Sequence, residues 1–129
     1  MKVLVVENST NLLTSLVTDL QEFGYVIDIV ADAGEAITHA SAGDYDIIIL
    51  DLMMPIESSL LVLHEIRELD REVEILILST QDQIRDRVTA LIQGADDYLE
   101  HPFSLDDLHS RIQSLVKRKP NPGHPPNWH

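Results

Sequence analysis

Short, mainly apolar runs alternate with segments of helical periodicity along most of this chain, and the alternation limits the folds open to it. The runs KVLVV, YVIDIV, YDIIIL, VEILIL and ADDYL span residues 2–6, 25–30, 45–50, 73–78 and 95–99. Such runs are typical of strands buried on both faces of a sheet, and ADDYL, which contains two acids, is the weakest of the five. We therefore expect a parallel sheet whose strands are joined by helices.

Each segment between these runs carries the apolar spacing and the end signals of a helix. Apolar side chains recur at three- and four-residue intervals, and glycine follows several of the segments. The expected boundaries are Gly24 for the first helix, Asp32 and Gly43 for the second, Ser58 or Ser59 as the cap of the third, and Gly94 for the end of the fourth.

Five strand–helix units joined by right-handed crossovers predict an open, doubly wound sheet. The expected strand order is 2-1-3-4-5, the flavodoxin-like (βα)5 arrangement, because a closed barrel of this kind needs eight units. We expect residues 1–118 to form one domain. Residues 119–129 are proline-rich and without periodicity, which predicts a linker or tail.

Composition narrows the function classes. The net charge is −13, from 22 acidic residues against 9 Lys and Arg, which argues against direct nucleic-acid binding by this unit. The acidity serves solubility or marks a cation site. There is no cysteine, so a thiol nucleophile and a cysteine zinc site are excluded. No apolar run approaches the ~20 residues of a membrane span, and we expect a cytoplasmic protein.

The residues that end the predicted strands should meet in one crevice, because open parallel sheets form sites beyond the carboxyl ends of their strands. These residues are Glu7 and Asn8, Asp51, Ser79 and His101. Two carboxylates and an amide oxygen suit Mg²⁺, and an aspartate beside Mg²⁺ can act as a nucleophile toward phosphorus. The plainer interpretation of Asp51 is a polar strand end or a helix cap.

Several motifs agree in order and spacing with one known family. They are KVLVVEN, YDIIILDLMMP, ILILST, GADDYLEHPF and LHSRIQSLVKR, between residue 2 and residue 118. With these motifs the chain resembles the receiver domain of two-component response regulators, a CheY-like phosphorelay module. The last two motifs most resemble the OmpR/PhoB winged-helix subfamily, in which a DNA-binding domain follows a linker.

The resemblance implies a role for each matched position. Asp51 would be the phospho-acceptor, Ser79 would contact the phosphoryl group, and Tyr98 would be an aromatic switch. The Mg²⁺ pocket would consist of Glu7, Asn8, Asp51 and the backbone carbonyl of Met53. A plainer interpretation of Tyr98 is packing on an edge strand.

Three positions depart from the family pattern. Asn8 replaces an acid and so weakens the expected Mg²⁺ site, and Ser59 stands where a glycine is usual. His101 occupies the position of a lysine that pairs with the phosphoryl group. A histidine lacks a permanent charge. His101 either approaches Asp51 or faces solvent. The second alternative is favoured by the extended conformation of a residue before proline, which cannot easily turn inward.

The resemblance also implies partners. These are a sensor histidine kinase, a second copy of the chain bound through the last two helices and the fifth strand, and DNA reached through a domain absent from this chain. The expected dimer residues are Arg87, Asp96, Asp97, Arg111 and Arg118. Solvated surface charges are the plainer interpretation of these residues, because single exposed ion pairs contribute only ~0–1 kcal/mol.

Three function hypotheses follow. The first is a receiver that takes a phosphoryl group from a histidine kinase, without turnover, and controls transcription. The second, motivated by Asn8 and His101, is an atypical receiver that acts as a dimerisation or binding module without phosphorylation. The third is a flavin or metal-dependent enzyme, which is weaker because no glycine-rich phosphate loop follows the first strand.

Overall fold

The computed structural model describes residues 1–7, 17–52, 54–70 and 72–117. The predicted tail, including Trp128, lies outside these residues. The strands are β1 (Lys2–Val6), β2 (Val26–Val30), β3 (Ile47–Asp51), β4 (Glu74–Ser79) and β5 (Asp97–Glu100). The helices are α2 (Ala33–Ala42), α3 (Ile56–Leu69), α4 (Ile84–Ile92) and α5 (Leu105–Lys117), with a 3-10 turn η1 at Gln81–Gln83. Residues 17–22 are also helical.

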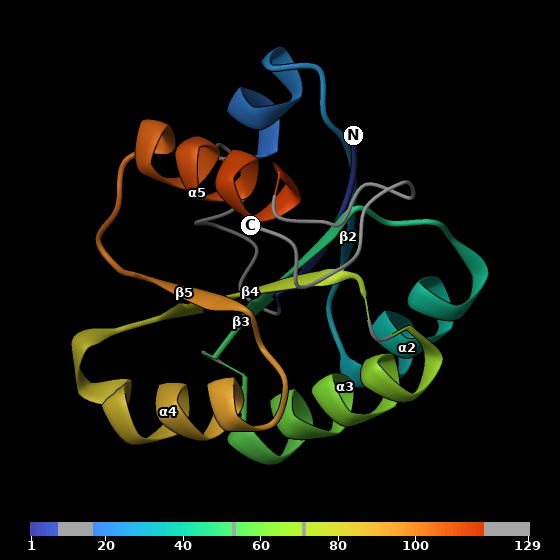
Figure 1. Ribbon diagram of the computed structural model, residues 1–129, viewed down its shortest axis with the longest axis vertical. Helices are drawn as coiled ribbons and strands as arrows, with labels where there is room; N and C mark the ends of the chain where they lie inside the picture. The colour runs from blue at the N-terminus through green and yellow to red at the C-terminus, as the bar shows by residue number, and fades with distance from the viewer. Residues whose placement is uncertain (8–16, 53, 71, 118–129) are drawn as a thin grey trace, which may run out of the picture.

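The five strands form one parallel sheet in the order β2-β1-β3-β4-β5, which confirms the predicted topology. Helix α5 and the helical residues 17–22 cover one face, and α2, α3 and α4 cover the other (Figure 1). Within the described ranges, no helix combines the length and apolar character that crossing a membrane requires.

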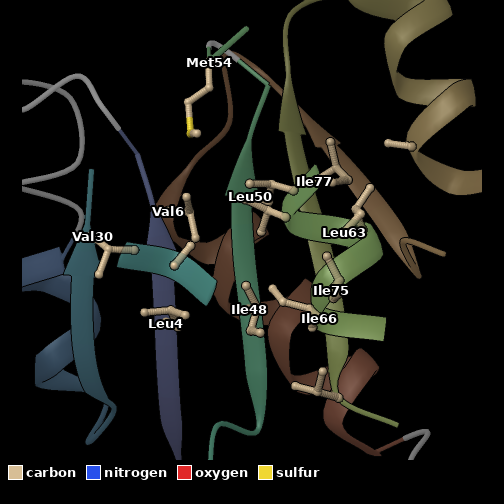
Figure 2. Packing of buried hydrophobic residues seen from close by; sticks show 14 of the residues in the cluster. Leu4, Val6, Val30, Ile48, Leu50, Met54, Leu63, Ile66, Ile75 and Ile77 are labelled. Atoms are coloured by element: carbon tan, nitrogen blue, oxygen red, sulfur yellow. The ribbon is translucent and has the colours of Figure 1, made fainter. Parts of the chain in front are cut away.

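The core has two layers because successive side chains of a strand point to opposite faces. In β1, Leu4 and Val6 belong to the layer under α2 and α3, whereas Val3 and Val5 belong to the layer under α5. Figure 2 shows the first layer, in which strand residues such as Leu4 and Ile48 lie in the same layer as Leu63 and Ile66 of α3. Burial on both faces explains the mainly apolar sequences of β1, β3 and β4, whereas the edge strands β2 and β5 are partly exposed.

Several predicted boundaries are confirmed. Asp32 caps α2 by accepting a 2.8 Å hydrogen bond from the Glu35 amide, and Gly43 is its C-cap. Gly24 and Gly94 both have positive φ, +89° and +125°, where the absence of a β-carbon is an advantage.

The expected cap of the third helix is wrong. Helix α3 begins at Ile56 with Pro55 as its N-cap, and no side chain caps it. The amides of Ser58 and Ser59 both donate to the Pro55 carbonyl, at 3.0 and 3.1 Å, so both serines lie inside the first turn. Proline already has the φ that a helix start needs, which moves the start ahead of the serines. The Ser59 side chain is consequently fully buried.

Arg67 on α3 ties together three segments at the end of the sheet opposite the strand-end residues. Its guanidinium donates to the carbonyls of Gly94 at 2.7 and 2.9 Å and of Val73 at 2.6 Å. It also pairs with the Asp96 carboxylate at 2.8 Å, and the same oxygen accepts the Ile75 amide at 2.8 Å. Asp96, expected on the dimer surface, is thus engaged within the chain.

Candidate functional site

Four of the predicted site residues meet at the carboxyl end of the sheet. Glu7 follows β1, Asp51 and Ser79 are the last residues of β3 and β4, and His101 follows β5. The register places Ser79 beside Glu100, directly before His101. Glu7, Asp51 and Ser79 are buried, and the His101 side chain is only 16% exposed. The four residues therefore gather at one edge of the sheet, as the strand topology predicted.

His101 points toward Asp51 rather than into solvent. Its amide donates to the Ser79 carbonyl at 2.7 Å, which fixes its backbone at the end of β4. Its Nε2 atom lies 3.8 Å from Oδ2 of Asp51, beyond hydrogen-bond distance. The peptide bond between His101 and Pro102 is cis. Of the two expectations for His101, approach to Asp51 is the one that the structure supports.

The environment of His101 favours its neutral form. Burial lowers the pKa of His101, and this outweighs the attraction of the Glu7 carboxylate, which raises it. A lysine in this place would carry its charge at any cellular pH. His101 is therefore a weaker source of positive charge beside Asp51 than a lysine would be.

Ser79 and Tyr98 lie on neighbouring strands, and the two side chains differ in exposure. The Ser79 hydroxyl is buried and has no hydrogen-bond partner among the described residues. Tyr98 is 38% exposed, and the Arg87 guanidinium lies over its ring at 4.3 Å from the centroid. In the register, Tyr98 pairs with Ile77, two residues before Ser79. Tyr98 thus faces outward.

The donor set fits a magnesium ion as far as it is described. Glu7 and Asp51 supply two buried carboxylates at the ends of adjacent strands, and Mg²⁺ typically uses one or two carboxylates together with waters and phosphate oxygens. The described residues contain no cluster of three or more Asp, Glu or His that could hold a metal. Asn8 and Met53, the other expected ligands, lie outside the described residues.

The expected dimer residues form ion pairs within the chain. Arg87 pairs with Glu100 at 3.1 Å and Arg111 with Asp97 at 2.8 Å, while Arg118 lies outside the described residues. Beside these pairs, α4 exposes three apolar side chains: Ile84, Val88 and Ile92. We call the four paired residues and these three apolar residues the α4–β5–α5 face.

Gln83 is a site-forming residue that the sequence reasoning missed. Its side chain accepts the Thr80 amide at 2.8 Å, and the Thr80 side chain accepts the Gln83 amide, a capping box. Its Nε2 also donates to the Leu52 carbonyl at 2.8 Å, next to Asp51. Gln83 thus joins the loops after β3 and β4. The Thr-x-x-Gln spacing of residues 80–83 is the sequence pattern that predicts this capping box.

Comparison with known proteins gives a consistent result. The chain matches the family model for the response regulator receiver domain over residues 3–113. It is 42% identical over 123 residues to the transcriptional regulatory protein BasR of Escherichia coli, covering 95% of this chain and 55% of BasR. It is 39% identical over 118 residues to the two-component response regulator PhoP of Pseudomonas aeruginosa, covering 92% and 52%. The chain spans about half the length of these curated relatives.

Solved structures agree with the fold. The receiver domain of a Pseudomonas aeruginosa sensor histidine kinase, with a magnesium ion coordinated in its active site cleft, superposes with a TM-score of 0.81 at 30% identity. That comparison covers 90% of this chain and 97% of the other. The chemotaxis protein CheY4 of Vibrio cholerae gives 0.79 at 28% identity, covering 88% and 97%.

Proposed function

Since this chain belongs to the response regulator receiver domain family, we propose that Asp51 accepts a phosphoryl group from a sensor histidine kinase. The observation that carries the proposal is the position of Asp51, a buried carboxylate at the end of β3 with Ser79 and His101 at neighbouring strand ends. The chain is a phosphoryl acceptor rather than a turnover enzyme, and we expect it in the cytoplasm.

The transfer is a single displacement at phosphorus. An Asp51 carboxylate oxygen attacks the phosphorus, the bond to the histidine nitrogen of the kinase breaks, and the freed imidazole takes up a proton. Bound Mg²⁺, held by Glu7 and Asp51, would offset the negative charge of the phosphoryl oxygens.

Ser79 and His101 are the groups placed to receive the phosphoryl oxygens. The Ser79 hydroxyl, buried and without a hydrogen bond to a described residue, is available to donate one. His101 can donate from Nε2, but it brings a full positive charge only when protonated. Electrostatic stabilisation is the main source of catalysis in phosphoryl transfer, so we expect this chain to react more slowly than a receiver with lysine in that place.

The output is a symmetric dimer formed through the α4–β5–α5 face. The exposed Ile84, Val88 and Ile92 supply apolar area, and the two arginine–carboxylate pairs can exchange partners with a second copy. Transcriptional control then passes through a DNA-binding domain outside this chain, as the names of its relatives suggest.

The test is intact-mass spectrometry after incubation with acetyl phosphate and MgCl₂. We expect one phosphoryl adduct that hydroxylamine removes, because hydroxylamine cleaves an acyl phosphate and leaves a serine phosphate intact. Asp51→Asn should abolish the adduct. Asp44→Asn, the same change at an exposed position before β3, should keep it. Absence of an adduct on the native chain, under conditions that modify a standard receiver, would refute the proposal.

The second candidate is a receiver that works without phosphorylation. The observation that favours it is the position of His101 beside Asp51, in surroundings where burial lowers the pKa of His101. It requires that Asp51→Asn leave the oligomeric state and the transcriptional output unchanged. Light scattering of the treated and untreated protein distinguishes the two, because only a phosphorylation-dependent receiver shifts toward dimer upon treatment.

A further inference from the structure

Strand β5 presents two of its side chains to α4. Leu99 is buried in the core layer under α5. Because alternate residues of a strand point to opposite faces, its neighbours Tyr98 and Glu100 lie on the face that α4 covers. Figure 1 shows α4 lying along this face beside β5.

Arg87 of α4 contacts both side chains. Its Nη1 donates to Oε1 of Glu100 at 3.1 Å, and its guanidinium carbon lies 4.3 Å from the centre of the Tyr98 ring. The Arg87 side chain is only 11% exposed, although Tyr98 itself is 38% exposed. Guanidinium groups stack well on aromatic rings, and the ion pair fixes the orientation of this one. Arg87 thus secures the outward ring with two different interactions.

Ser79 favours the opposite, inward position of the Tyr98 ring. Its hydroxyl is buried on the strand next to Tyr98 and has no hydrogen-bond partner among the described residues. An unsatisfied buried hydroxyl favours any arrangement that gives it a partner, and the Tyr98 phenol can both donate and accept. A ring that turned inward would have to leave the Arg87 guanidinium.

We propose that Arg87 is a positioning residue that holds Tyr98 outward in the unphosphorylated chain, and that loss of this contact lets the ring turn toward Ser79. The proposal rests on the proposed function, since movement of Tyr98 matters only in a receiver. It also implies that Arg87 takes part in one of two mutually exclusive sets of contacts. It either holds Tyr98 and Glu100 within one chain or binds a carboxylate of a second copy.

The experiment measures the exposure of the Tyr98 ring directly. Protein labelled with 3-fluorotyrosine gives one fluorine NMR signal for each of its 3 tyrosines, and Tyr98→Phe assigns the relevant signal. Relaxation by a soluble gadolinium chelate then reports how far solvent reaches the ring. All spectra are recorded on unphosphorylated, dilute protein.

Arg87→Ala should shield the Tyr98 signal from the chelate. An exposed cation–π contact of ~0.5–1 kcal/mol corresponds to a rise in the inward-to-outward ratio of roughly 2- to 5-fold. Arg87→Lys should restore part of the outward population. Arg85→Ala, the same change at an exposed position of the same helix, should leave the signal unchanged.

A ring that stays outward in Arg87→Ala becomes more accessible to the chelate, because its cover has been removed, and this result would overturn the proposal. If Arg87→Ala fails to fold, Arg87→Gln tests the same point by removing the charged guanidinium while keeping a long side chain, and a Tyr98 signal that is not shielded there overturns it. No phosphorylation is involved, so failure of the proposed function leaves this measurement intact.

Discussion

We expect the His101→Lys substitution to make Asp51 a faster phosphoryl acceptor. His101 lies 3.8 Å from Oδ2 of Asp51, and burial favours its neutral form. A unit positive charge at this distance interacts with a unit negative charge by about 4 kcal/mol at an effective dielectric constant of ~20. Desolvation of the new ammonium offsets much of this. A net lowering of the barrier by ~1–2 kcal/mol corresponds to a rate increase of roughly 5- to 30-fold.

The assay is the rate of adduct formation from acetyl phosphate at saturating MgCl₂, followed by intact mass. His101→Gln is the matched control, since glutamine keeps a hydrogen-bond donor without a charge, and it should show no gain. Thermal melting of both variants verifies that they are folded. A lysine variant that is folded but no faster than the native chain would show that positive charge beside Asp51 does not limit the reaction.

Three further predictions concern stability and pH. Ser59→Ala should raise the free energy of unfolding in urea by about 1 kcal/mol, because it removes a fully buried hydroxyl that has no hydrogen bond to a described residue; a lower midpoint would contradict this. Arg67→Ala should lower the free energy of unfolding by roughly 2–4 kcal/mol, since the Gly94 and Val73 carbonyls and the Asp96 carboxylate lose a donor. A loss within error of zero would show that this network does not stabilise the fold. Burial and the Asp28 carboxylate raise the pKa of Tyr45 to about 12 from 10.0, so its contribution to stability is complete below pH 10 and is lost as the pH rises toward 12. Tyr45→Phe should flatten the alkaline part of a stability–pH profile, and an unaltered profile would refute the linkage.

The positions of the site residues along the chain were predictable from sequence. The apolar run before Asp51 ends where the strand ends, and parallel topology brings the strand ends together. The Thr80–Gln83 capping box was also readable but was overlooked. The cap of α3 was misplaced because the conformation of Pro55 prevailed over the capping preference of serine.

The sequence by itself determined which strands form, their order, and which residues stand at their carboxyl ends. These features follow from burial and from spacing within a few residues. Only the tertiary structure decided that His101 turns toward Asp51, that Asp96 pairs with Arg67, and that Arg87 covers Tyr98. Arg67 and Asp96 are 29 positions apart in the chain. Such contacts depend on how loops and helices pack in space, and local periodicity contains no information about that packing.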